Sequence, residues 1–212
     1  RTMVVAMMLL MMWAVYLFIV NEQPDLRVPV IAVLLIQGSV AVGQFALQRD
    51  LGFQWLGEPV LDVHRSGVSV VSARGGRWLR AYGLAGHPNL LAATLAALLL
   101  LLVAETDGGR AGRRVSFALA ASAGMLGLVA TFSRGAWLAF GAGLVCWIVR
   151  RATGAVNPHG ASTPRDRTAF GPLVGEHLHL IIPIVLASLL LASSYDLVLS
   201  RFLRLDSPTE AP

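Results

Sequence analysis

Six long apolar stretches without Asp, Glu, Lys or Arg constrain this chain more than any other feature. Each approaches the roughly 20 residues that a helix needs to cross a hydrocarbon core about 30 Å thick. The chain is 56% hydrophobic and 14% charged, and its charges fall between the stretches. This pattern predicts an all-α fold, a polytopic transmembrane helical bundle. We expect spans at residues 3–20, 28–47, 88–104, 115–132, 135–149 and 178–195.

The arginines favour a membrane partner over nucleic acid. The formal net charge is +5, and all 17 basic residues are arginines. They lie at the ends of the apolar stretches and not on one soluble basic face, which a nucleic-acid-binding protein would need. Anionic lipid headgroups or lipid-linked phosphates are therefore the nearer partners.

Six spans place the connecting segments alternately on two sides of the bilayer. Side one receives residues 21–27, 105–114 and 150–177, and side two receives 48–87, the turn at 133–134 and the tail 196–212. The arginine count does not identify the cytoplasmic side, since side one carries eight and side two nine. The arginines crowded into the short loop 105–114 favour side one as cytoplasmic.

The side-two loop 48–87 contains a predicted β-hairpin. Residues 67–72 and 77–82 have the pattern of two short strands around a glycine-containing turn. In a strand, Trp78, Arg80 and Tyr82 would share one face. An arginine between two aromatic residues suits a sugar or phosphate contact, and an aromatic belt at the membrane interface is an equally common explanation.

The tripeptide His87-Pro88-Asn89 opens the third apolar stretch. Proline suits the first turn of a helix, so ordinary helix capping accounts for this motif. The functional interpretation places His87 and Asn89 at a polar cavity near the positive end of the helix dipole. Both interpretations stay open at this point.

The segment Ser133-Arg134-Gly135 marks a turn between two spans. Residues 115–149 as one helix would be about 52 Å long, which is too long for a single span. Ser133 suits an N-cap, and Gly135 permits a tight turn. Arg134 then lies close to the hydrocarbon edge, where it either snorkels to headgroup phosphates or serves a functional site.

The remaining residues give weaker indications. Glu58 on side two could act as an acid or base, although most such loop residues are simply solvated. His177 and His179 are two residues apart, which does not place two ligands on one helix face, so we expect no metal. Close helix packing is indicated by glycines inside the spans, namely Gly38, Gly43, Gly124 and Gly127.

Two of these motifs together resemble a known family. Arg80 followed by Tyr-Gly and then His87-Pro88-Asn89, with Thr131-Phe-Ser-Arg-Gly135 after the next span, is similar to the O-antigen ligase and O-antigen polymerase superfamily of bacterial polysaccharide membrane enzymes. The lead-in at residues 44–58 is similar to its members as well. The resemblance covers about residues 30–150 and rests on the order, spacing and span context of short motifs.

The resemblance implies a multi-pass glycosyltransferase of the bacterial inner membrane. It would move a glycan from an undecaprenyl-diphosphate carrier to a hydroxyl on lipid A core or on another glycan, with no cofactor. Its site would face away from the cytoplasm, which makes side two extracytoplasmic. Arg80 and Arg134 are the candidate catalytic residues, since guanidinium groups can stabilise the charge that develops on the departing diphosphate. The candidate substrate-binding residues are His87, Asn89, Ser133, Trp78 and Tyr82.

The resemblance also implies a longer protein. Family members have about twice as many spans, and this chain begins without Met and ends in the polar segment 206–212. In the family, a histidine of a large extracytoplasmic loop is the usual candidate for the base. That loop would begin near residues 201–212. Ligase and polymerase activity are both compatible with these motifs.

A component of a transporter or flippase is the alternative function. In that case Arg80 and Arg134 would bind an anionic lipid-linked substrate during its passage. Transporters commonly place such sites at the bilayer midplane on broken helices. Here the polar clusters lie at span ends, which favours an interfacial enzyme.

Overall fold

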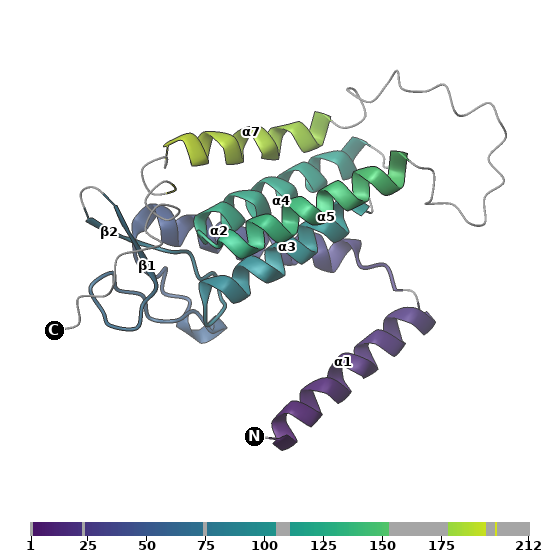
Figure 1. Ribbon diagram of the computed structural model, residues 1–212, viewed down its shortest axis with the longest axis horizontal. Coiled ribbons are helices and arrows are strands. Elements are labelled where there is room, and N and C mark those ends of the chain that lie inside the picture. Colours follow the sequence, from purple (N-terminus) through teal and green to yellow (C-terminus); the bar gives the residue numbers. More distant parts are fainter. Residues whose placement is uncertain are drawn as a thin grey trace.

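The computed structural model describes residues 2–22, 24–73, 76–104, 111–152, 178–193 and 198. This part of the chain is mainly helical, as expected, and each of the six apolar stretches forms a helix (Figure 1). The helices are α1 (Thr2–Glu22), α2 (Arg27–Leu47), α3 (Pro88–Ala104), α4 (Ala111–Ala130), α5 (Arg134–Ala152) and α7 (Leu178–Ser193), with a short 3-10 helix η1 (Gln54–Leu56).

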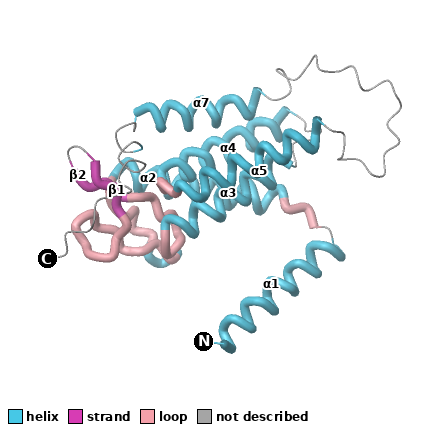
Figure 2. Tube along the Cα trace, in the orientation of Figure 1, coloured by secondary structure: helices cyan, strands magenta, loops and turns pink. Residues whose placement is uncertain are grey.

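Five of these helices run side by side, and α4 packs against α2, α3 and α7. Helix α5 packs against α3, whereas α1 lies apart from the bundle (Figure 1). The loops and the two strands gather at one end of the bundle (Figure 2). The loop after α2 and the turn before α5 therefore lie together, in agreement with the alternation of the connecting segments.

Glycines allow α2 and α4 to approach closely. A Cβ atom at Gly38 would lie 2.3 Å from the carbonyl oxygen of Ala123, and one at Gly124 would lie 2.7 Å from Cδ2 of Leu34. Both distances are below van der Waals contact. The backbone obstacle at Gly38 leaves room only for glycine, whereas at Gly124 the leucine side chains would have to shift. The core that surrounds this contact consists of buried leucines and alanines, including Leu34, Leu95, Leu99 and Leu128.

The predicted hairpin is present but shorter than expected. Strands β1 (Val70–Ala73) and β2 (Gly76–Leu79) are antiparallel, with Val70 paired to Leu79. Because β2 ends at Leu79, the prediction that Trp78, Arg80 and Tyr82 share one face is wrong. Trp78 is 40% exposed, whereas Arg80 and Tyr82 are 3% and 5% exposed. Beyond β2, the N–H of Arg80 still donates to the carbonyl of Ser69, and the N–H of Ala81 then donates to the carbonyl of Ala130 at the end of α4.

Among the described helices, α2 alone is both long and apolar enough to cross a membrane by length and composition. Shorter apolar helical segments are Leu9–Glu22, Pro88–Ala104 and Val115–Ala130. The helical bundle is therefore shown, whereas the arrangement of six spans stays a prediction. The predicted connector at 150–177 lies outside the described residues beyond the end of α5. The predicted tail at 196–212 lies outside them except for residue 198.

Substitution of Gly38 by alanine is expected to destabilise the bundle. The added methyl group meets backbone atoms of α4, so the two helices must move apart, at a cost of about 1–3 kcal/mol. The midpoint of thermal unfolding in detergent, followed by circular dichroism, measures this loss.

Gly141→Ala on α5 is the matched control, because no heavy atom lies within 4 Å of a Cβ at Gly141. Alanine in an exposed helix interior should be neutral or stabilise by up to about 1 kcal/mol. Equal midpoints for the two variants would show that α2 and α4 do not pack as closely as described.

Candidate functional site

The Arg80 guanidinium is buried and joins three segments of the chain. Its Nε donates to the backbone carbonyl of Thr131 at 2.6 Å, Nη1 to the hydroxyl of Ser69 at 2.9 Å and Nη2 to Oδ1 of Asn89 at 2.7 Å. Ser69 precedes β1, Thr131 follows α4, and Asn89 lies in the first turn of α3. A single side chain thus holds the hairpin, the start of α3 and the end of α4 together.

The end of α4 is completed by groups from this cluster. The last four carbonyls of a helix lack partners within the helix. Here the carbonyl of Ala130 accepts from Ala81 N–H, that of Leu128 accepts from the Thr131 hydroxyl and from Nε1 of Trp137, and those of Gly127 and Val129 accept from the two residues after the helix. The positive charge of Arg80 also lies at the end of α4 where the helix dipole favours a cation.

The turn between α4 and α5 places its strained residue at Phe132. We expected Gly135 to permit the tight turn, but the positive φ, 49°, belongs to Phe132, and Gly135 lies inside α5. A bulky residue in this conformation costs about 1–3 kcal/mol and persists where its surroundings hold it. The Phe132 ring is 1% exposed and packs against Phe45 and Trp137, with ring centroids 5.5 and 6.2 Å apart. Burial of this ring therefore outweighs the preference for glycine.

Two glutamines of α2 and its C-cap residue Gln48 hold the backbone on both sides of Arg80. Oε1 of Gln48 accepts from Leu79 N–H, Oε1 of Gln44 from the N–H groups of Tyr82 and Gly83, and Oε1 of Gln37 from Leu84 N–H, at 2.7–3.0 Å. Gln37 and Gln44 are seven residues apart, which places their amides on one face of α2. Gln48 follows the helix in the left-handed conformation, with a φ of 55°. Together the three amides fix the conformation of residues 79–84.

Glu58 supports the same hydrogen bonds that hold residues 79–84. It is 3% exposed, and its carboxylate accepts from Nε2 of Gln44 at 2.7 Å and from the N–H groups of Leu51 and Phe53 at 2.8 and 2.6 Å. The Nε2 group of Gln44 also donates to the Gly83 carbonyl at 2.9 Å. Glu58 therefore organises the loop after α2 and links it to the Arg80 segment.

His87 caps helix α3. Its Nδ1 accepts from the N–H of Asn89 at 3.1 Å, and its carbonyl accepts from Leu90 and Leu91. The capping interpretation of the His87 motif is thus confirmed, while its role in substrate binding stays a prediction. The ring of His87 meets that of Tyr82 edge-on, with centroids 6.4 Å apart, and the Tyr82 hydroxyl accepts from Ser69 N–H.

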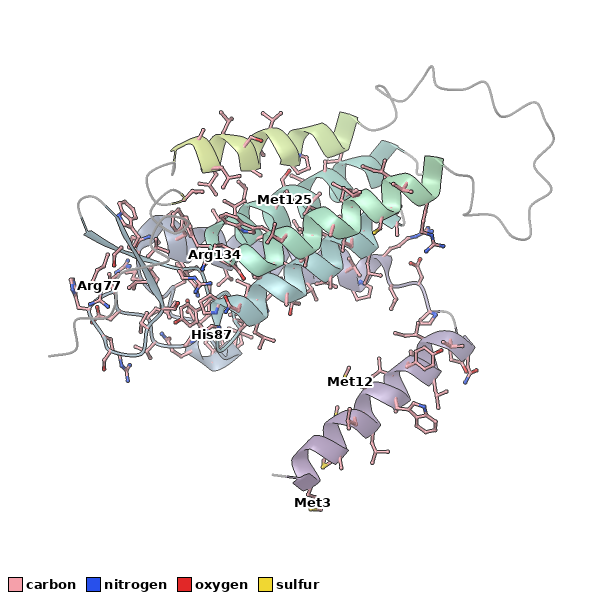
Figure 3. All side chains as sticks on the ribbon, viewed as in Figure 1. Met3, Met12, Arg77, His87, Met125 and Arg134 are labelled. Atoms are coloured by element: carbon pink, nitrogen blue, oxygen red, sulfur yellow. The ribbon has the colours of Figure 1, made fainter. Side chains whose placement is uncertain are left out.

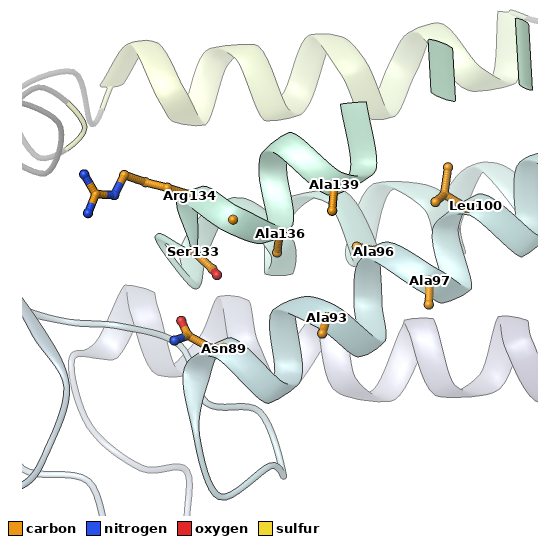
Figure 4. A pocket seen from close by; sticks show the side chains of 10 residues that line it. Asn89, Ala93, Ala96, Ala97, Leu100, Ser133, Arg134, Ala136 and Ala139 are labelled. Atoms are coloured by element: carbon orange, nitrogen blue, oxygen red, sulfur yellow. The ribbon is translucent and has the colours of Figure 1, made fainter. Parts of the chain in front are cut away.

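A groove of about 640 Å³ runs between α3 and α5. Asn89 and Ser133 face each other at its mouth, and the half-buried side chain of Arg134 extends from this mouth away from the apolar part (Figure 4). The rest of the groove is walled by Ala93, Ala96, Ala97, Leu100, Ala136 and Ala139. At the far end Leu100 covers Gly143, where a Cβ atom would lie 2.6 Å from Cδ1 of Leu100.

The structure brings four of the predicted site residues together. Arg80 bonds to Asn89, and Asn89 lines the same groove as Ser133 and Arg134. His87 lies at this end of the bundle as well, as Figure 3 shows together with Arg134. Trp78 pairs with the buried Val71 in the hairpin and is 40% exposed, and its ring centroid is 6.5 Å from that of Phe45.

The sequence interpretation missed the three glutamines, Ser69 and the role of Glu58. One signal was available, because Gln37 and Gln44 are uncharged polar residues at helical spacing within an apolar stretch, and Gln48 directly follows it. Such residues need partners when they are buried.

No protein-family model, curated protein or solved structure matches the chain.

Substitution of Gln44 by leucine is expected to destabilise the site end of the bundle. The change leaves the buried N–H groups of Tyr82 and Gly83 without their acceptor, at a cost of about 1–3 kcal/mol for each unsatisfied group. Thermal unfolding in detergent measures the loss.

Gln54→Leu is the matched control, since the Gln54 side chain is exposed and bonds to Asp50 at the surface. It should change stability by less than about 0.5 kcal/mol. A Gln44 variant as stable as this control would show that Gln44 does not hold the backbone of Tyr82 and Gly83.

Proposed function

We propose that the chain is the donor-binding part of a membrane glycosyltransferase of O-antigen ligase type. The observation that carries the proposal is the groove between α3 and α5, which joins a polar, cationic mouth to an apolar wall. A lipid-linked diphosphate matches both parts, because it joins an anionic, polar headgroup to an apolar chain in one molecule. The motif resemblance in the same residues narrows the ligand to a glycan carried on undecaprenyl diphosphate.

The mouth of the groove suits the diphosphate. Asn89 lies in the first turn of α3, and Arg134, Gly135 and Ala136 form the first turn of α5. Two helices thus direct their N-termini toward one place, where their dipoles favour an anion. Arg134 adds a guanidinium group that can bind phosphate oxygens through two parallel hydrogen bonds.

The wall of the groove suits the lipid chain. From Asn89 to Leu100 the groove follows α3 over about 16 Å. Its volume lies within the range of about 300–1,000 Å³ that is common for small-molecule sites. Alanine side chains leave room for a chain between the helices and offer no hydrogen bonds to it. A prenyl chain would therefore remain in an apolar setting while its diphosphate reaches the mouth.

The chemistry assigns different roles to the two arginines. The acceptor hydroxyl attacks the anomeric carbon, the bond from that carbon to the diphosphate oxygen breaks, and the electron pair passes to the departing diphosphate. Arg134 stabilises the charge that develops there. Arg80 places Asn89 and the turn that carries Arg134, and its own charge adds to the positive field at the mouth. The hydroxyl proton passes to a base, for which the motif resemblance implies a histidine of a large extracytoplasmic loop.

The proposal includes a membrane setting. Helix α2 is long and apolar enough to span a bilayer. The other helices would complete a bundle of six spans in the bacterial inner membrane. The end of the bundle that carries the loops and the groove mouth would then face away from the cytoplasm, where a glycan or lipid A core acceptor is available.

Arg134→Ala in the native, membrane-embedded protein is expected to lower glycan transfer about 10²–10³-fold, the usual cost of removing one preorganised group that stabilises developing charge. Transfer from undecaprenyl-diphosphate-linked glycan in isolated membranes measures the loss, and immunoblotting of the membranes measures insertion.

Arg77→Ala is the matched control. Arg77 is an exposed arginine of β2 at the outer tip of the hairpin (Figure 3), and its loss should leave transfer unchanged. Normal transfer by the Arg134 variant would refute the mechanism. Retained binding of the lipid-linked glycan without any transfer by the native protein would instead favour the transporter alternative.

A further inference from the structure

The loop after α2 folds back along that helix. The Leu51 side chain lies against Gly43, where a Cβ atom would be 2.9 Å from Cδ1 of Leu51. Gly43 is four residues before the end of α2, so the loop returns about 6 Å along the helix axis. Leu51 and Phe53 then form an open groove of about 420 Å³ with one face of α2, whose residues are Leu35, Ile36, Ser39 and Val40.

This loop exposes large apolar side chains next to the apolar surface of α2. Trp55 is 79% exposed, Val60 55% and Leu56 47%. On α2, Ile36 and Leu47 are 53% and 57% exposed, and Ile36 lines the same groove as Leu51 and Phe53 of the loop. Tryptophan is enriched at membrane interfaces, because its ring is apolar and its N–H group can reach polar groups there.

The loop supplies partners to several of its own backbone N–H groups. Glu58 accepts from Leu51 and Phe53, and Asp50 accepts from Leu61 at 3.2 Å. The N–H groups of Leu56, Gly57 and Glu58 donate to carbonyls of Phe53 and Gln54. An irregular segment at membrane depth needs such internal partners, since hydrocarbon offers none.

We infer that residues 51–60 are a lipid-embedded anchor of the site. Trp55 and Leu56 enter the interfacial region of the bilayer, and a phospholipid acyl chain occupies the groove between the loop and α2. The inference rests on the proposed membrane setting of α2. The anchor is connected to the site through hydrogen bonds. The Glu58 carboxylate bonds to Gln44, and Gln44 holds the backbone next to Arg80. The anchor thereby sets the depth of the groove mouth relative to the lipid headgroups.

Site-directed spin labelling tests this inference. Single cysteines replace Trp55, Ile36 or Arg77 in the protein carrying Cys146→Ser, and each variant is labelled in vesicles of phosphatidylethanolamine and phosphatidylglycerol. Collisions with oxygen report lipid, and collisions with a water-soluble nickel chelate report water. The labels at 36 and 55 should collide with oxygen and lose most nickel collisions, whereas the label at 77 should show the reverse. Val60→Cys provides a second position in the loop with the same expected pattern as 55.

Two results would overturn the inference, and they are distinguishable. If the labels at 55 and 60 meet nickel as often as the label at 77 while the label at 36 remains in lipid, the loop lies in water and α2 still spans the bilayer. If the label at 36 also meets nickel, the membrane setting of α2 fails and the anchor fails with it.

Discussion

The burial of the Arg80 guanidinium is the constraint on which the rest of this end of the molecule depends. A buried charge is expensive unless it is hydrogen-bonded and electrostatically compensated. Here the Thr131 carbonyl, the Ser69 hydroxyl and the Asn89 amide oxygen accept from it, and the end of α4 supplies a favourable dipole. Each acceptor comes from a different segment. These segments must therefore meet before the charge can leave water.

The neighbouring features follow from that requirement. The backbone on both sides of Arg80 is held by the amides of Gln37, Gln44 and Gln48. The Gln44 amide is itself fixed by Glu58 and the Gly83 carbonyl. Phe132 adopts a strained backbone conformation because its ring fills the space beneath the hairpin beside Phe45. Strain and buried polar groups gather at functional sites more often than elsewhere. Their concentration beside one groove supports a binding role for it.

The sequence predicted the helices well, because a charge-free apolar stretch of sufficient length is a local property. It also predicted the hairpin and the meeting of the two polar clusters, because successive antiparallel helices place their connections alternately at the two ends of a bundle. The conformation of the turn was wrong, since the choice of Phe132 over Gly135 depends on aromatic packing from α2 and α5. The face that Trp78, Arg80 and Tyr82 were expected to share was wrong for a similar reason, because β2 ends at Leu79 and the N–H of Ala81 bonds to the end of α4.

In the proposed mechanism, Arg80 acts through the geometry of its fork, which sets Asn89 and the Arg134 turn at the mouth of the groove. The affinity of the purified Arg80→Lys protein for undecaprenyl diphosphate tests this role. Lysine keeps the charge but cannot direct three nitrogens to three separated acceptors. We expect this variant to lose at least about tenfold in affinity, equivalent to about 1.4 kcal/mol. An affinity equal to that of the unaltered protein would show that charge alone suffices and that the fork geometry of Arg80 is not required.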